Sequence, residues 1–179
     1  MADQFSIRCA VAADTAAIAA LMDASISALQ RHYLTPDQIA ASRAVMGLDR
    51  QLIADGTYFL VERGDRLAGG GGWSARATLY GGDHSAGLRD ARMLDPASEP
   101  ARIRAMYTHP DFARQGVGRL VLRQCEAAAA DHGFRRFELM ATLAGEPLYK
   151  ACGYRAIERI ESAPVDGVSV PLVRMVKLA

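Results

Sequence analysis

The residues of this chain that could do chemistry gather in a glycine-interrupted turn at 113–119, with the sequence Ala-Arg-Gln-Gly-Val-Gly-Arg. A strand-like segment precedes this turn, and an amphipathic helical pattern begins on it. Gly116 and Gly118 allow a ligand to approach the backbone amides without a Cβ in the way, at the positive end of the helix dipole. Arg114 and Arg119 flank the turn, and a guanidinium matches the geometry of phosphate oxygens. The turn therefore predicts an anion site, and a pyrophosphate suits its field.

Two nucleotide-binding motifs share part of this pattern, and the chain matches neither of them fully. A dinucleotide-binding fingerprint needs a third glycine where Val121 stands, although Glu138 lies near the spacing of its acidic residue. A nucleoside-triphosphate loop needs Gly-Lys-Ser/Thr, and the chain has Gly118-Arg119-Leu120. A Gly-x-Gly pair also occurs at helix starts for packing reasons alone. A Rossmann-type nucleotide enzyme is therefore a weaker alternative.

The C-terminal half predicts the elements that hold this turn in place. Residues 102–108 alternate apolar and polar side chains as a strand does, and the strand ends at Pro110 because proline cannot donate to a sheet. The apolar stripe after Gly116 indicates a helix that stops at Gly133. Further expected elements are a strand at 136–141, a short helix at 147–153 and closing strands near 154–160 and 168–178, with Pro171 at a sheet edge or a bulge.

The N-terminal half predicts the elements that flank a substrate. They are a strand at 5–11, a helix capped by Asp14, a helix capped by Thr35 with Pro36 at its first position, and a hairpin of 57–62 and 67–73. The glycine run 69–72 indicates a bulge, a close approach by another backbone or a ligand, or simply a poorly packed strand end. Residues 74–100 read as a long loop with one short strand around 78–80, and we expect this loop to choose the substrate.

Two segments together resemble a known family. Residues 106–118, Met-Tyr-Thr-His-Pro-Asp-Phe-Ala-Arg-Gln-Gly-Val-Gly, resemble the acyl-coenzyme A binding motif of the GNAT-type N-acetyltransferases, and Leu148-Tyr149-Lys150-Ala151-Cys152-Gly153-Tyr154 resembles their later Phe-Tyr-x-x-x-Gly-Phe motif. Both occur in the family's order and spacing, within roughly residues 102–160. The resemblance implies an acyl-CoA N-acyltransferase fold of the α/β (α+β) class, with a mixed, largely antiparallel central sheet of about seven strands flanked by helices.

The resemblance also implies where acetyl-CoA binds. Its pantetheine arm would lie in a gap where the sheet splays between its fourth and fifth strands, and Tyr149 would sit beside the thioester sulfur. The residues placed against this cosubstrate are Met106, Tyr107, Thr108, Ala113, Arg114, Gln115, Gly116, Val117, Gly118 and Arg119, and no metal is expected. Two positions depart from the family pattern: Ala113 replaces its first Arg/Gln, and Ala144 replaces an asparagine often found before the later tyrosine.

Proton transfer sets the demands on the site. A thiol has a pKa near about 8.5 and a tyrosine about 10, so full donation by Tyr149 is uphill by roughly 2 kcal/mol, and a hydrogen bond to the departing sulfur is easier. An alkylammonium with a pKa of about 10.4 must lose a proton before attack, at a cost of roughly 4 to 5 kcal/mol at pH 7. The strand at 102–105 offers no glutamate for this purpose. Candidate bases, directly or through water, are Glu62, Asp83, His84 and His109.

The sequence thus predicts an N-acetyltransferase in which a primary amine of an unidentified acceptor, a small molecule or a peptide, directly attacks acetyl-CoA. Trp73, Tyr80, Tyr33 and His32 could line an acceptor pocket, although such aromatics are more often core or rim residues. The missing strand carboxylate favours an alternative, a non-catalytic acyl-CoA sensor or interaction module on the same fold.

Composition bounds the setting. The 179 residues fit a single domain, 1–179, and the net charge of +1 (21 − 20) is too balanced for a protein that binds nucleic acid. Three widely spaced cysteines, without a C-x-x-C pair, predict no disulfide framework or zinc site and a cytoplasmic location. We expect no membrane partner, because no segment approaches the roughly 18 apolar residues of a membrane span. The sequence leaves open whether the protein forms a homodimer.

Overall fold

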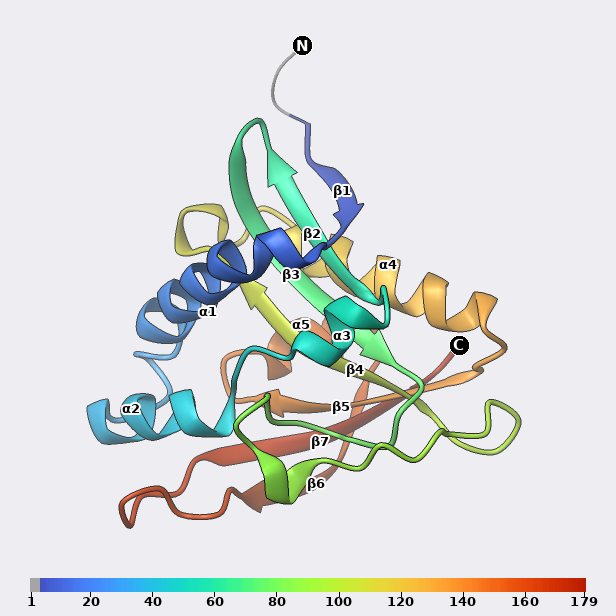
Figure 1. The fold of residues 1–179 in the computed structure, drawn as a ribbon. Helices are drawn as coiled ribbons and strands as arrows, with labels where there is room; N and C mark the ends of the chain where they lie inside the picture. The colour runs from blue at the N-terminus through green and yellow to red at the C-terminus, as the bar shows by residue number, and fades with distance from the viewer. Residues whose placement is uncertain (1–3) are drawn as a thin grey trace.

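The computed structural model describes residues 4–179, which form a seven-stranded mixed sheet in the order β1-β2-β3-β4-β5-β7-β6 (Figure 1). The strands are β1 (Ser6–Cys9), β2 (Tyr58–Arg63), β3 (Arg66–Ser74), β4 (Ala101–Thr108), β5 (Arg136–Thr142), β6 (Arg155–Glu161) and β7 (Pro171–Leu178). Only the β4–β5 pair is parallel. The predicted mixed, largely antiparallel sheet is confirmed.

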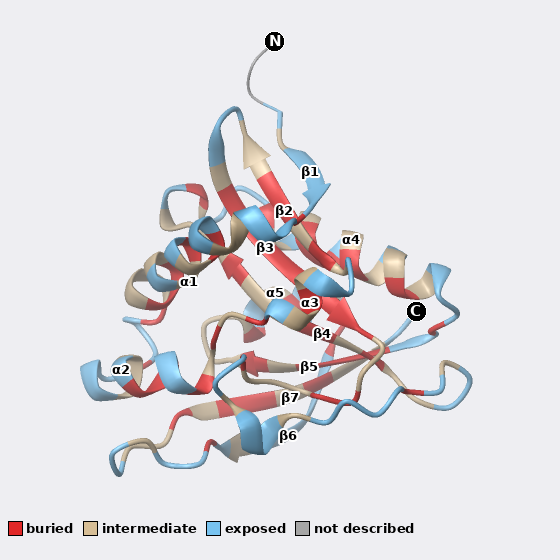
Figure 2. Cartoon of the chain, viewed as in Figure 1, coloured by how far each residue is buried: buried red, intermediate tan, exposed pale blue. Residues whose placement is uncertain are grey.

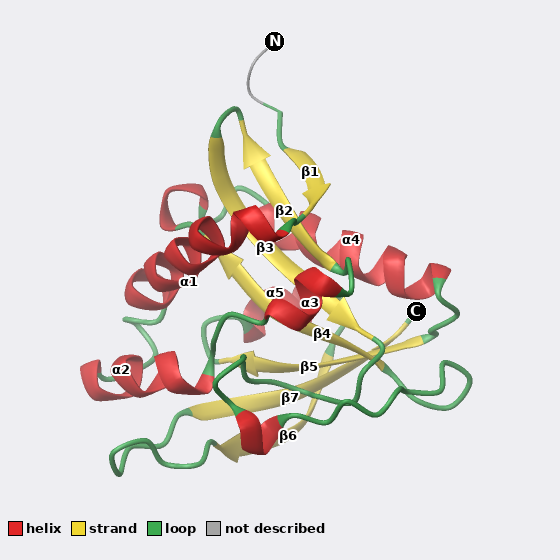
Figure 3. Cartoon of the chain, in the orientation of Figure 1, coloured by secondary structure: helices red, strands yellow, loops and turns green. Residues whose placement is uncertain are grey.

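Helices cover both faces of the sheet (Figure 3). They are α1 (Thr15–Leu29), α2 (Pro36–Val45), α3 (Arg50–Ala54), α4 (Val117–Asp131) and α5 (Glu146–Ala151). In Figure 1, α1 and α3 lie in front of the β2–β4 half and α4 lies behind it. The largest core cluster joins α4 to the sheet around Trp73, Ile103, Val121 and Phe137, and the buried positions run along the middle of the central strands (Figure 2).

The helix ends follow the local sequence closely. Thr35 caps α2 by accepting from the Gln38 amide at 3.2 Å, and Gln38 accepts in return from the Thr35 amide. The expected stop of α4 at Gly133 is confirmed by its φ of +90°. Asp14 does occupy the N-cap of α1, but its carboxylate makes no cap bond and instead pairs with Arg8 at 2.7 Å.

The four-glycine run in β3 contains the predicted bulge, and at Gly71 side chains rather than a backbone or a ligand come close to it. The register with β4 shifts between Gly70 and Gly72, so Ala105 and Met106 of β4 face Gly71 alone in a β-bulge. A Cβ on Gly71 would lie 2.8 Å from Val121 Cγ1, which is too close for any side chain. The glycines therefore let α4 sit directly against the strand.

The parallel pair β4–β5 separates almost as soon as it forms. Only Ala101 with Phe137 and Arg102 with Glu138 are paired. Beyond these residues β5 continues beside β7, while β4 continues beside β3. The predicted splay between the fourth and fifth strands is confirmed.

Two local predictions are wrong. Residues 78–80 form no strand; the loop is tied instead by an isolated bridge between Arg76 and Met93 and by Thr78, whose hydroxyl donates to the Asp90 carbonyl at 3.0 Å. Pro171 lies neither on an edge strand nor at a bulge. It is the first residue of the internal strand β7, where its missing N–H removes no ladder bond from the strand's interior.

The helix over Ala12–Leu29 corrects another expectation, because it is long and apolar enough to cross a membrane by length and composition. Mostly buried core helices of soluble proteins and signal sequences near the N-terminus pass the same test, and 17% of this segment is buried. Here Leu21 and Ile26 are buried against Tyr107 of β4. Absence of a membrane partner stays a prediction. Cys9, Cys125 and Cys152 are all free, as expected.

Candidate functional site

A cavity of about 110 Å³ opens where β4 leaves β5. Its wall combines both separated strands with α5 and two N-terminal segments. The lining residues are 45–47, 79–81, 103–107, Leu139, Met140, Thr142, Gly145, Tyr149 and Leu172. Residues 79–81 belong to the long loop that the sequence assigns to acceptor choice, so that loop does reach the cavity.

The bulged part of β4 presents an edge to this cavity. Met106 and Tyr107 line it, and no described residue of β5 pairs with β4 beyond Arg102. Ala105 has a φ of +51°, and its carbonyl accepts from the Tyr58 hydroxyl at 2.9 Å, which holds the bulge. An unpaired strand edge can accept an extended group as an added strand.

The glycine turn lies at the far end of this edge. A Cβ on Gly118 would lie 3.6 Å from Thr108 Oγ1 and 2.7 Å from Leu148 Cδ2, so the start of α4 contacts both β4 and α5. Gly116 has a φ of +87° and open space where a side chain would be. The cavity and the turn are therefore connected along β4.

The amides of the turn divide into two groups. The Ala113 amide donates to the Pro110 carbonyl at 3.1 Å, and the Gln115 amide donates to the Phe112 carbonyl at 3.4 Å. The first amides of an α-helix, here from Val117 onward, have no intrahelical acceptor. Arg114, Gln115, Gly116 and Arg119 are exposed. The helix start is thus a better donor to an anion than the turn before it.

Tyr149 lines the cavity from α5. Its ring packs edge-on against Tyr154 at 5.9 Å between centroids, and only 8% of the residue is exposed. Burial raises the pKa of Tyr149 above its ordinary value of 10.0. Among residues 4–179, no side chain or backbone group hydrogen-bonds its hydroxyl. The group is a protonated donor free to meet a ligand.

The four candidate bases do not line the cavity. Glu62 pairs with Arg8 at 2.8 Å on the β1–β2 side of the sheet. His109 accepts from the Asp111 amide at 3.2 Å, and His84 Nε2 lies 2.6 Å from the Ala44 carbonyl. Asp83 accepts from the Arg50 amide at 3.0 Å. Asp83 and His84 follow the cavity-lining Gly81 by two and three residues, and His109 follows the cavity-lining Tyr107 by two.

The predicted aromatic wall is only partly assembled. Tyr80 lines the cavity. Trp73 is buried in the core against Phe134, and Tyr33 is 47% exposed at the surface. Among the described residues, no group of three His, Cys, Asp or Glu side chains is placed to hold a metal ion.

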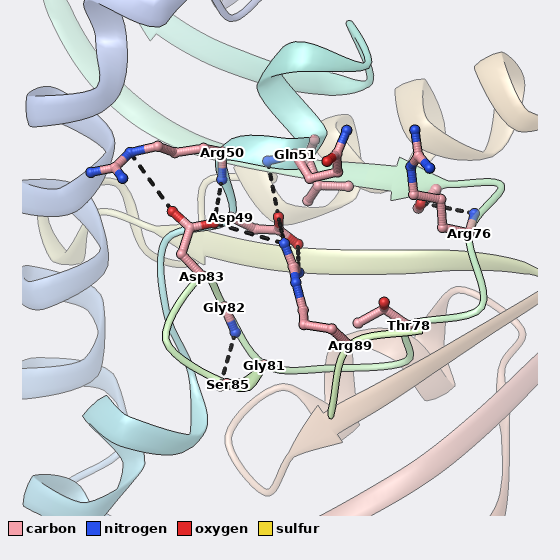
Figure 4. A network of polar contacts seen from close by, with 12 residues as sticks. Asp49, Arg50, Gln51, Arg76, Thr78, Gly81, Gly82, Asp83, Ser85 and Arg89 are labelled. Carbon is pink, nitrogen blue, oxygen red and sulfur yellow. Dashed lines mark hydrogen bonds and ion pairs between the residues drawn. The ribbon is translucent and has the colours of Figure 1, made fainter. Parts of the chain in front are cut away.

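A buried charge cluster beside the cavity escaped the sequence analysis. Arg104, whose side chain is 3% exposed, pairs with the fully buried Asp49 at 2.6 Å and also donates to the Gly81 carbonyl at 2.8 Å. Asp49 additionally accepts hydrogen bonds from Arg89 through both of its oxygens, each at 3.0 Å. Figure 4 shows these two residues with their contacts as dashed lines. The sequence held one hint of this cluster: Arg104 lies in the interior of the strand β4, where a charged residue needs a partner.

Comparison with known proteins identifies the family to which this chain is similar. The model of the Acetyltransferase (GNAT) family matches residues 20–154. An uncharacterized N-acetyltransferase of Bacillus subtilis, YjcF, is 31% identical over 104 residues, which cover 58% of this chain and 70% of YjcF.

Solved structures share the fold over nearly the whole chain. A GCN5-related N-acetyltransferase from Rhodopseudomonas palustris superposes with a TM-score of 0.72 at 18% identity, covering 100% of this chain and 98% of its own. The PaiA N-acetyltransferase of Thermoplasma acidophilum, solved with coenzyme A, gives 0.65 at 12% identity, with 98% and 99% covered. The acetyltransferase YncA of Salmonella typhimurium, solved with acetyl-CoA, gives 0.62 at 20% identity, with 97% and 93% covered.

Proposed function

Since the chain belongs to the Acetyltransferase (GNAT) family, we propose that it transfers an acetyl group from acetyl-CoA to a primary amine by direct attack. The observation that carries this proposal is the continuity of three features along β4: the cavity with Tyr149, the unpaired bulged edge, and the amide-rich start of α4. Two relatives of the same fold were solved with coenzyme A or acetyl-CoA, which supports the choice of cosubstrate.

The residues fit such a cosubstrate. The backbone of Met106 to Thr108 would hold the pantetheine arm as an added strand, because its edge has no partner in β5. The amides of 117–119 would hold the pyrophosphate, with Arg114 and Arg119 adding charge. Gly116 leaves open space at this point, where a side chain would otherwise stand.

Bound acetyl-CoA supplies the activated acetyl group as a thioester. In the net reaction a C–N bond forms, the C–S bond breaks, and the amine gives up a proton. Tyr149 donates a hydrogen bond to the departing sulfur. Its raised pKa makes complete proton transfer to a thiolate more costly than in water, so stabilisation by the hydrogen bond is its favoured contribution.

The acceptor must arrive as a neutral amine or lose its proton in the site. No Asp, Glu or His side chain is among the described residues that line the cavity. A water chain to the segment after Gly81, where Asp83 and His84 stand, is our proposed exit for the proton. The apolar part of the wall favours the neutral amine, because burial penalises the charged form.

An acceptor screen tests the function. The purified protein is incubated with acetyl-CoA and a panel of small amines and peptides, and products are detected by mass shift alongside thiol release. We expect acetylation of at least one amine with stoichiometric release of coenzyme A. Binding of coenzyme A without transfer to any amine would contradict the enzymatic proposal.

A second candidate, an acyl-CoA sensor or interaction module on the same fold, is favoured because no carboxylate or imidazole stands among the described residues of the cavity wall. The same screen separates the two. A sensor gains thermal stability with acetyl-CoA and releases no thiol with any amine, whereas the enzyme does both.

A further inference from the structure

One buried donor in the cavity wall has no acceptor. Among the described residues, none accepts a hydrogen bond from Arg104 Nε, although the side chain is only 3% exposed. The other two guanidinium nitrogens are engaged, Nη1 with Asp49 and Nη2 with the Gly81 carbonyl. Leaving a buried N–H without an acceptor costs free energy, so we expect a bound ligand to supply the acceptor.

The charge around this donor is positive. Asp49 is shared by Arg104 and Arg89, which leaves two positive charges against one negative. Asp83, 3.8 Å from Arg89, is offset by Arg50 at 3.7 Å, as Figure 4 shows. The cluster of Asp49, Arg50, Asp83, Arg89 and Arg104 therefore keeps a net charge of +1 (3 − 2) next to the cavity.

Both carboxylate oxygens of Asp49 are already occupied by donors of this chain. Its Oδ1 accepts from the Gln51 amide at 3.1 Å and from Arg89 Nη2 at 3.0 Å. Its Oδ2 accepts from Arg89 Nη1 at 3.0 Å and contacts Arg104 Nη1 at 2.6 Å. With both oxygens saturated, the carboxylate serves to hold Arg104 in place.

Arg104 and Tyr149 line the same small cavity. The cavity has a volume of about 110 Å³. Because both residues line it, we expect a group that meets Arg104 to be compact and to lie near the reacting amine. A carboxylate is such a group, because one of its oxygens can accept a charge-assisted hydrogen bond from the remaining Nε–H.

We propose that Arg104 binds a carboxylate carried by the acceptor next to its amine, so that the substrates are small amino acids. This inference rests on the proposed function and names its substrate class. A polyamine is disfavoured by the same geometry, because its second ammonium would face the net positive cluster with no carboxylate in the described wall to receive it.

The test compares matched acceptors on the wild-type protein. The panel contains the common L-amino acids, their carboxamides, the amines left after removal of the carboxyl group, and spermidine. Acetylation is followed by mass shift and thiol release, and kcat/KM is determined for each acceptor. We expect the best amino acid to exceed both its amide and its decarboxylated amine by about tenfold or more, because a site built to bind a group rejects the analogue that lacks it.

A variant assigns the preference to Arg104. Arg104→Lys keeps the charge and a donor for Asp49 but loses the planar fork. We expect the ratio of kcat/KM for the amino acid to that for its decarboxylated amine to fall about tenfold. Arg102→Lys is the matched control, since Arg102 lies two residues away on β4, pairs with Glu138 and does not line the cavity. It should leave the acid-to-amine ratio unchanged.

The possible outcomes distinguish the amino-acid preference from the proposed acetyltransferase activity. Acetylation of amides, decarboxylated amines or spermidine as efficiently as of amino acids overturns the inference and leaves the acetyltransferase intact. So does an Arg104→Lys variant with an unchanged ratio. No transfer to any amine while acetyl-CoA binds overturns both and favours the sensor. If Arg104→Lys does not fold, the wild-type ratio still decides.

Discussion

Arg102 and Arg104 stand two residues apart on β4, yet the two ends of the β4–β5 pair use them differently. At the closed end, Arg102 and Arg174 surround the buried carboxylate of Glu138 on β5, where the strands are paired. At the open end, β5 has turned away, and Arg104 takes its partner Asp49 from the start of α3 instead. Burial lowers the pKa of both arginines.

For these two buried arginines, the presence or absence of a paired strand, rather than the residue type, decides the role of the side chain. At the closed end both sides of the ion cluster belong to the sheet, so the cluster stabilises the fold. At the open end the missing strand leaves a cavity, and one donor of Arg104 stays unused. Changes at the closed end should therefore cost stability, and changes at the open end should cost activity.

The largest expected effect is the loss of the carboxylate at the closed end. Glu138→Gln leaves two arginines without their shared counter-ion, and we expect the free energy of unfolding to fall by about 3–5 kcal/mol. Urea denaturation measures it. Glu158→Gln is the control, because Glu158 is 52% exposed and only 3.6 Å from Arg174, where a pair contributes about 0–1 kcal/mol. Equal losses in the two variants would break the comparison.

The next effect is on turnover at the open end. Tyr149→Phe removes the proposed donor to the sulfur, and we expect kcat to fall about 100-fold, with coenzyme A affinity nearly unchanged. Steady-state kinetics and calorimetry check this. Tyr154→Phe is matched, since its hydroxyl donates to Glu126 at 2.9 Å and does not line the cavity. The role of Tyr149 would be lost if both variants turned over alike.

A smaller effect is expected where the bulge meets α4. Gly71→Ala would force Val121 and Met106 to move, at a cost of about 1–3 kcal/mol. Because Met106 lines the cavity, KM for acetyl-CoA should rise as well. Gly87→Ala has no neighbouring atom within 4 Å and should change neither quantity. A silent Gly71→Ala would show that the open end tolerates a different bulge.

The smallest effect concerns the ion pairs that fasten α5. Lys150 at 2.9 Å and Arg159 at 2.7 Å hold the pKa of Glu146 below its ordinary value of 4.5. A carboxylate with a lowered pKa stabilises the fold above its unfolded pKa and loses that contribution as the pH falls through and below 4.5. Glu146→Gln should therefore cost about 0.5–1 kcal/mol at pH 7, and the difference from wild type should disappear in acid. A pH-independent difference in denaturation midpoint would argue against the pairs.

Local patterns predicted the elements well where a few neighbouring residues suffice. The capping pair Thr35 and Gln38, the stop at Gly133 and the glycines of β3 each act within one turn or one strand pair. Pro171 and residues 78–80 were misjudged because strand order and loop ties depend on contacts far along the chain.

The candidate site divides in the same way. The turn at 113–119 could be located from residue types and spacing, and Tyr149 from the resemblance of 148–154 to a family motif, although their binding and catalytic roles stay predictions. Asp49 could not be located, because nothing near it in the chain marks it as the partner of an arginine 55 positions later (104 − 49). Likewise, nothing in the sequence shows that the four candidate bases lie outside the cavity lining.

By itself, the order of amino acids determined where many of the helices and strands begin and singled out a turn that can face an anion, since these depend on backbone preferences and near neighbours. Only the tertiary structure decided that β4 and β5 part after two residue pairs and that Arg104 is buried there with a spare donor. The physical reason is that burial and pairing arise from segments distant in the chain, whose meeting no local pattern records.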